Sequence, residues 1–204
     1  QRHFDFQAVR GTLGHHGNAS GETAPMLKKT LTGAIVLFAM SGAALAGEQY
    51  VDETGFAISG YDAVAYFNLA QKDDGMMQPH AVPGRADITA DYNGATWAFA
   101  TAENRDIFLA DPAKYAPKYD GHCAYGVAKG AKVPANPNLW RIVDGSLYLN
   151  ITPEVAETWN SDIADYIMDA NDEWSDLEPK SASDDSWMEM SDNDGTYDMA
   201  APIK

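Results

Sequence analysis

The residue type with the richest chemistry in this chain occurs once. Cys123 is the only cysteine, and a histidine directly precedes it at position 122. A thiolate binds soft ions such as Cu(I) and Zn(II), and imidazole suits both. Neighbouring side chains of a strand point to opposite faces, so the two residues share a site only if the backbone turns there. Gly121 permits such a turn, and we interpret Cys123 and His122 as candidate metal ligands.

Other uses of the same thiol stay open. Free cysteine commonly packs as a small hydrophobic residue. A lone thiol in an exported protein can also serve redox chemistry or join two chains. One cysteine and one histidine do not complete a tetrahedral zinc site, even if Asp120 adds an oxygen. A metal site at Cys123 therefore requires ligands from elsewhere in the fold or from a second chain.

Two methionine-containing segments are further candidates. Met76, Met77 and His80 lie in one short stretch, and thioether with imidazole suits copper. The alternative for this stretch is a flexible loop with incidental methionines. Near the end of the chain, Trp187 to Met190 reads Trp-Met-Glu-Met, which can hold Cu(I) or belong to a plain disordered tail.

An export signal precedes these residues. Residues 26–46 combine a basic start, an apolar run and the small-residue sequence Ala44-Leu45-Ala46, as in a cleavable signal peptide. The apolar run is short for a transmembrane anchor. We expect cleavage after Ala46, a mature chain that starts at Gly47, no membrane insertion afterwards, and a periplasmic or secreted location. Residues 1–25 precede the natural start of such a signal and are interpreted as a non-native or wrongly assigned extension.

The composition narrows the range of partners. The chain has 30 acidic and 14 basic residues, for a formal net charge of −16. An acidic protein is repelled by nucleic acid and by anionic membrane surfaces, so neither is an expected partner. Metal ions and a basic partner protein remain plausible, as does a role of the charge in solubility alone.

Two hairpins and several helices should position the candidate residues. Alternating apolar residues flank Asn93-Gly94 and Asp144-Gly145, dipeptides that are typical of tight hairpin turns. Thr101 is an expected N-cap for a helix over 102–109, and Asp111-Pro112 begins a short second helix. The longest helix is expected to open at Thr152 and to end near residue 174.

These elements predict an α+β fold. We expect a small antiparallel sheet built from the two hairpins, packed against several helices, within a domain over residues 47–178. Residues 179–204 are rich in Ser, Asp, Gly and Asn, and they are interpreted as a disordered acidic tail.

Several blocks of the sequence carry a resemblance to a known family. The blocks are Gly60 to Phe67, Tyr92 to Phe99, Ala102 to Phe108, Asp111 to Pro117, Cys123 to Ala128 and Ile142 to Asn150. In this order they closely resemble the secreted bacterial branch of the YHS-domain family, over roughly residues 50–174. The resemblance implies a small α+β domain often suspected of metal binding. His122 stands where such proteins usually have an aromatic residue, and the tail has no counterpart.

Three functions follow as hypotheses. The first is an exported binding module for a soft transition metal, copper or zinc with copper favoured, through Cys123, His122, His80 and Met77. The second is an accessory subunit of an envelope complex that binds no metal. The third is a thiol-dependent enzyme, although the sequence has no phosphate-binding loop, nucleophile elbow or zinc-protease motif.

Overall fold

The computed structural model describes residues 47–73 and 77–190 of the 204-residue chain. The elements run in the order β1 (Arg85–Tyr92), β2 (Ala95–Phe99), α1 (Ala102–Ala110), α2 (Pro112–Tyr115), α3 (Ala124–Ala128), β3 (Asn136–Val143), β4 (Ser146–Asn150), α4 (Pro153–Asn160), α5 (Ile163–Leu177) and α6 (Trp187–Met190). Short 3-10 helices cover Ile58–Gly60, Ala65–Asn68 and Lys118–Gly121. The expected signal peptide, the extension before it and residues 191–204 of the expected tail lie outside the described residues.

The α+β class and both predicted hairpins are confirmed. Strand β1 pairs with β2, and β3 with β4, each pair antiparallel. Asn93 and Gly94 have φ of 50° and 74°, and Asp144 and Gly145 have φ of 48° and 74°. Both central residues of a type I′ turn need positive φ, which explains these dipeptides. The hairpins form two separate two-stranded sheets, where a single sheet was expected.

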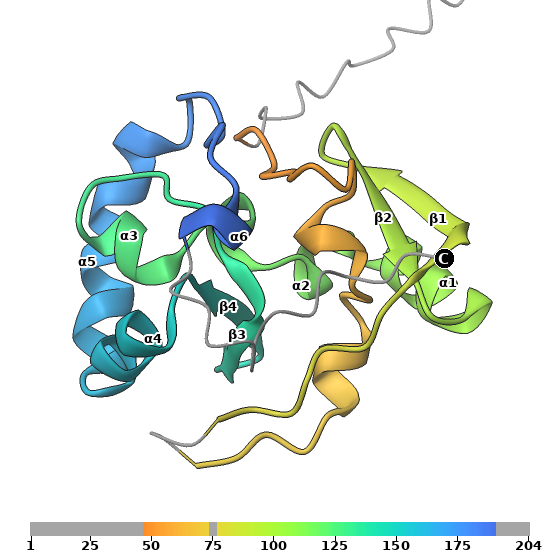
Figure 1. Cartoon of the computed structure of the whole chain (residues 1–204), viewed down its shortest axis with the longest axis horizontal. Coiled ribbons are helices and arrows are strands. Elements are labelled where there is room, and N and C mark those ends of the chain that lie inside the picture. Colours follow the sequence, from red (N-terminus) through yellow and green to blue (C-terminus); the bar gives the residue numbers. More distant parts are fainter. Residues whose placement is uncertain (1–46, 74–76, 191–204) are drawn as a thin grey trace, which may run out of the picture. The chain divides into compact units, whose positions relative to one another are not determined.

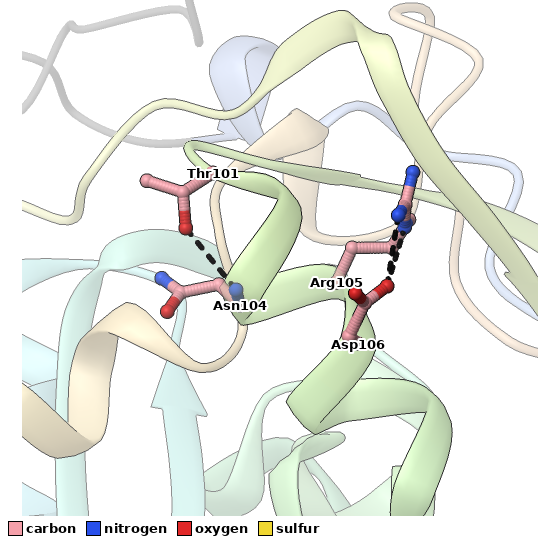
Figure 2. A network of polar contacts seen from close by, with 4 residues as sticks. All are labelled: Thr101, Asn104, Arg105 and Asp106. Atoms are coloured by element: carbon pink, nitrogen blue, oxygen red, sulfur yellow. Dashed lines mark hydrogen bonds and ion pairs between the residues drawn. The ribbon is translucent and has the colours of Figure 1, made fainter.

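Helix α1 begins where the sequence predicted. Oγ1 of Thr101 accepts a hydrogen bond from the backbone N–H of Asn104 at 3.1 Å, as Figure 2 shows. Further along the same helix, Arg105 pairs with Asp106 at 2.8 Å on the surface (Figure 2), where such an ion pair contributes little to stability. The side-chain amide of Asn104 donates to the buried carboxylate of Asp62 at 2.7 Å and so fixes α1 to the segment between the 3-10 helices Ile58–Gly60 and Ala65–Asn68.

The single long helix expected from Thr152 onward is divided in two. Helix α4 is capped by the Thr152 side chain and ends at Asn160, and α5 starts at Ile163. Between them Asp162 has φ of −155° and ψ of 64°, far from helical values. Asn, Ser and Asp at 160–162 favour caps over helix interiors, because their side chains compete for backbone hydrogen bonds. The break redirects α5, which runs to Leu177 instead of ending near residue 174.

The helices and hairpins enclose two clusters of buried side chains. One cluster joins both hairpins and includes Trp97, Phe99, Phe108, Trp140 and Cys123. The other lies among α3, α4, α5 and β4 and includes Val127, Tyr148, Trp159, Ala170 and Leu177. Helices α3, α4 and α5 lie together beside the β3–β4 hairpin (Figure 1). Cys123 belongs to the first cluster and Ala124 to the second, so this segment lies between the two clusters.

Within the segment expected to be a disordered tail, Trp187 and Met188 pack against the first cluster, and the tail as a whole stays a prediction. Trp187 opens the short helix α6 and is completely buried. Its indole N–H donates to Asp52 at 3.1 Å and to Ser59 at 2.9 Å. The polar composition of the segment gave no sign of this contact. One aromatic side chain buries enough area to hold a short polar segment in place.

Among the residues that the structure describes, no helix has both the length and the apolar character needed to cross a bilayer.

Candidate functional site

Cys123 lies at the start of α3 and is fully buried. Its Sγ accepts a hydrogen bond from the N–H of Gly126 at 3.4 Å and so serves as the N-cap of the helix. The thiol donates toward Oδ1 of Asn150 at 3.6 Å. Its backbone forms a parallel bridge with Leu149 of strand β4. The thiol is thus a structural part of the junction between α3 and β4.

Burial also determines the charge of this thiol. Removal from water raises the pKa of Cys123 to about 11, against a smaller opposing effect of nearby backbone N–H groups. The thiolate is the form that attacks electrophiles and binds metal ions. With this pKa the group is a neutral thiol at pH 7, in contrast to the lowered pKa of reactive cysteines.

His122 is equally enclosed, and both of its ring nitrogens have partners. Nδ1 lies 2.9 Å from the carbonyl oxygen of Tyr119, and Nε2 accepts a hydrogen bond from the N–H of Ser183 at 3.2 Å. A carbonyl requires a donor and an N–H requires an acceptor, so Nδ1 carries the proton of a neutral ring. Burial lowers the pKa of His122 to about 4, while the Tyr119 carbonyl acts in the opposite direction.

The two candidate ligands at 122 and 123 therefore do not converge. The imidazole is held between Tyr119 and Ser183, whereas the thiol points to Gly126 and Asn150. Within residues 47–73 and 77–190, no group of three or more His, Cys, Asp and Glu side chains is arranged to hold a metal ion. Metal coordination by Cys123 stays a prediction, and it would require α3 or its cover to open.

The Met77–His80 segment has the opposite character. Met77 is 53% exposed, and His80 is exposed as well. The backbone on either side of His80 is fixed to strand β3. The Trp140 indole donates to the carbonyl of Pro79 at 2.8 Å, and Ala81 donates to the side chain of Asn138 at 2.9 Å. His80 is thus presented to solvent from an anchored segment.

A pocket of about 260 Å³ lies beside this segment, between β3, the end of β4 and α4. Apolar surface comes from the helix and the strand, and the polar groups are mainly side-chain amides. Arg141 and Glu157 bring opposite charges to the walls. The lining residues are Met77, Gln78, Asn138, Leu139, Trp140, Arg141, Asn150, Pro153, Ala156, Glu157 and Asn160. Apolar walls with a few placed polar groups are typical of small-molecule sites.

Asn150 connects the pocket to the sealed thiol. It lines the pocket, and its Oδ1 also accepts from the N–H of Tyr125 at 3.3 Å and from Cys123. On the opposite strand, Arg141 is 5% exposed and donates to the Asn160 side chain at 3.0 Å and to the carbonyls of Lys72 and Asp73. Of the four predicted ligands, Met77 lines this pocket, whereas His80, His122 and Cys123 do not.

Sequence reasoning missed the strand amides of this pocket. Asn138 and Asn150 line it and are buried, as is the nearby Asn136 of β3, although asparagine is depleted in strands. The Asn-Pro-Asn sequence at the start of β3 was the available signal, since buried amides need partners that a strand ladder does not provide. Asn138 meets this need by donating to the Tyr61 hydroxyl at 3.2 Å and accepting from Ala81.

Part of the chain matches the model of a known domain family. The model of the YHS domain matches residues 76–119, which confirms the YHS-domain resemblance for that stretch. The matched stretch includes Met77, His80, the first hairpin, α1 and α2, and it ends before Cys123. No curated protein and no solved structure matches the chain.

Proposed function

We propose that this protein is an exported binding module that holds a small polar molecule in the pocket between β3 and α4. The observation that carries the proposal is the pocket itself, with buried amides, opposite charges at Arg141 and Glu157, and apolar surface from Leu139 and Trp140. Export is supported by the signal-like sequence of residues 26–46.

The chemistry of the walls favours a zwitterionic ligand such as a free amino acid. Amide side chains both donate and accept hydrogen bonds, so they suit a ligand with both kinds of group. The Arg141 guanidinium already donates to Asn160, Lys72 and Asp73, but its positive charge in the wall favours a ligand carboxylate. Glu157 provides the complementary charge for an ammonium group. A catalytic role for Cys123 is disfavoured by its raised pKa.

A panel of the common amino acids provides the test. We expect at least one to raise the melting temperature and to give a saturable calorimetric titration. Ala156 is partly buried in the pocket wall, so Ala156→Phe should fill the space and abolish binding. Ala113→Phe, at an exposed position of α2, is the matched control. Equal responses from the wild type and Ala156→Phe would refute the pocket as the site.

Soft-metal binding is the second candidate, and the exposed pair Met77 and His80 supports it. Both lie within the stretch that matches the YHS domain, and thioether with imidazole suits copper. In a competition titration with Cu(I), the double variant Met77→Ala/His80→Ala should lose binding while Cys123→Ser retains it. The reverse result would support the Cys123 site expected from the sequence, and no binding by any form would remove the metal hypothesis.

A further inference from the structure

Gly47 occupies an enclosed position at the beginning of the described chain. It is buried, and a methyl group on its Cα would lie 2.3 Å from Oδ2 of Asp120 and 2.6 Å from the carbonyl oxygen of Glu178. Both distances are far below a van der Waals contact, so no residue with a side chain fits there. The backbone nitrogen of Gly47 is bonded to the same Cα, which places it within about 5 Å of that carboxylate oxygen.

One oxygen of the carboxylate beside Gly47 lacks a hydrogen-bond partner among the described residues. Among the described residues, Oδ2 of Asp120 is a buried side-chain oxygen without a hydrogen bond. The other oxygen, Oδ1, accepts from the Asn93 amide at 3.3 Å, and the same amide donates to the carbonyl of Gly47 at 3.0 Å. The Asn93 side chain thus contacts both Gly47 and the Asp120 carboxylate. A buried, unpaired carboxylate oxygen is costly and calls for a donor.

The surrounding charges do not satisfy this oxygen. Lys132 attracts Asp120, whereas Glu178 repels it, and burial raises the pKa of the Asp120 carboxyl above its ordinary value. The Lys132 ammonium donates instead to the carbonyl oxygens of Glu178 at 3.2 Å and Lys180 at 2.6 Å. Glu48 also acts on Lys132. A second cation would compensate this predominantly acidic group.

The sequence indicates where that cation comes from. Ala44-Leu45-Ala46 precedes Gly47, and small residues at these positions are those that signal peptidases recognise. Water adds across the Ala46–Gly47 amide during such a cleavage, which leaves a carboxylate on Ala46 and an amine on Gly47. The amine takes up a proton near neutral pH, since an ordinary α-amino group has a pKa of about 7.7–8.0.

We propose that cleavage after Ala46 creates a structural ion pair, in which the new α-ammonium group of Gly47 binds Oδ2 of Asp120. The glycine leaves room for the amine to approach, and Asn93 holds both partners in register. Processing of the precursor thereby completes the polar network at this position. The pair also ties the mature N-terminus to the segment after α5, through the Glu178 carbonyl that lies next to Gly47.

The test compares the full precursor with the protein that a bacterial host exports and processes. Mass spectrometry of the exported protein should place its N-terminus at Gly47. Competitive acetylation should show the α-amine reacting roughly tenfold more slowly at pH 7 than in a model glycyl peptide, which corresponds to one unit of raised pKa. Asp120→Asn should restore the ordinary rate, whereas Asp172→Asn, which removes an exposed carboxylate from α5, should leave it slow.

A second variant covers the case in which Asp120→Asn does not fold. Insertion of one alanine between Ala46 and Gly47 moves the processed amine by one residue, and its acetylation rate should become ordinary in a folded protein. An N-terminus other than Gly47, or an ordinary acetylation rate in the processed wild type, would overturn the proposal. Equal melting temperatures of the precursor and the processed wild type would overturn it as well.

Discussion

The Cys123 segment and the Met77–His80 segment both carry side chains suited to soft metal ions, and they differ mainly in exposure to solvent. At the Cys123 segment, thiol and imidazole are buried and fully engaged by backbone groups and Asn150. At the Met77–His80 segment, thioether and imidazole face solvent beside a pocket. The comparison teaches that burial and hydrogen bonding decide the role of such residues, so the more reactive residue type serves here as structure.

The largest effect on stability should come from Trp187, which packs in the same buried cluster as Cys123. Trp187→Ala removes a completely buried side chain and its hydrogen bonds to Asp52 and Ser59. Truncation of a buried aromatic residue costs about 3–5 kcal/mol of unfolding free energy, which urea denaturation would measure. Met168→Ala, at a 57% exposed position, is the control and should stay within about 0.5 kcal/mol. A cost for Trp187→Ala as small as the control's would show that residues 180–190 do not cover the core.

Acid should lower the free energy of unfolding through His122, the buried histidine beside Cys123. Its pKa is about 4 in the folded protein and near 6.5 in the unfolded chain, so the unfolded chain binds the extra proton first as pH falls. Stability should be complete above pH 6.5 and decline toward pH 4, by about 3 kcal/mol for a shift of this size. The measurement is the free energy of unfolding between pH 4 and pH 8.

His122→Gln should flatten that decline, whereas His80→Gln, at an exposed position, should leave it unchanged. Burial raises the pKa of Asp120, which favours the folded state at low pH and lets stability fall as pH rises. This opposite contribution is common to all three proteins and cancels in the comparison. Parallel pH profiles for the wild type and His122→Gln would contradict the assignment.

Substitutions of Cys123 should lower stability by a smaller amount, and the ranking of two replacements is informative. Cys123→Ala removes the acceptor that caps α3 at Gly126, and loss of a cap costs about 1–2 kcal/mol. Cys123→Ser keeps an acceptor for Gly126 and a donor for Asn150, so it should be the milder change. If the thiol were merely a small hydrophobic residue, serine would be the worse replacement, because a buried hydroxyl is costly. Thermal denaturation of the two variants distinguishes these outcomes.

Substitutions in the exposed Met77–His80 segment should have the smallest effect on stability. Met77→Ala and His80→Ala should each change the free energy of unfolding by less than about 0.5 kcal/mol, because exposed side chains contribute little. Chemical denaturation would measure this. A loss above 1 kcal/mol in either variant would show that these side chains support the fold, and the contrast between the two regions would then be weaker.

The sequence predicted best what is determined locally. Asn93-Gly94 and Asp144-Gly145 specify their turns through positive φ, and Thr101 and Thr152 cap helices within a few residues. None of these depends on the rest of the chain, so the hairpins and the starts of the helices were accessible to inspection.

What the sequence could not reveal depends on distant residues. The pocket arises because the segment after Met77 is hydrogen-bonded to side chains of β3, and residues of α4 complete the wall. The burial of Cys123 depends on β4, and that of Trp187 on Asp52 and Ser59 from the other end of the domain. Composition identified the last segment as polar, but one tryptophan among its polar neighbours decides where that segment lies.

The contact between the two ends of the domain also governs when the protein can finish folding. The Tyr50 hydroxyl donates to the carbonyl of Asp185, 135 residues away, and accepts from the N–H of Trp187. Contacts of such long range close late, after the local turns and helices have formed. A chain delivered N-terminus first cannot make them until residue 187 has emerged. A chain that emerges in this direction therefore passes through an interval with part of its aromatic core uncovered, when holding chaperones and proteases compete for it.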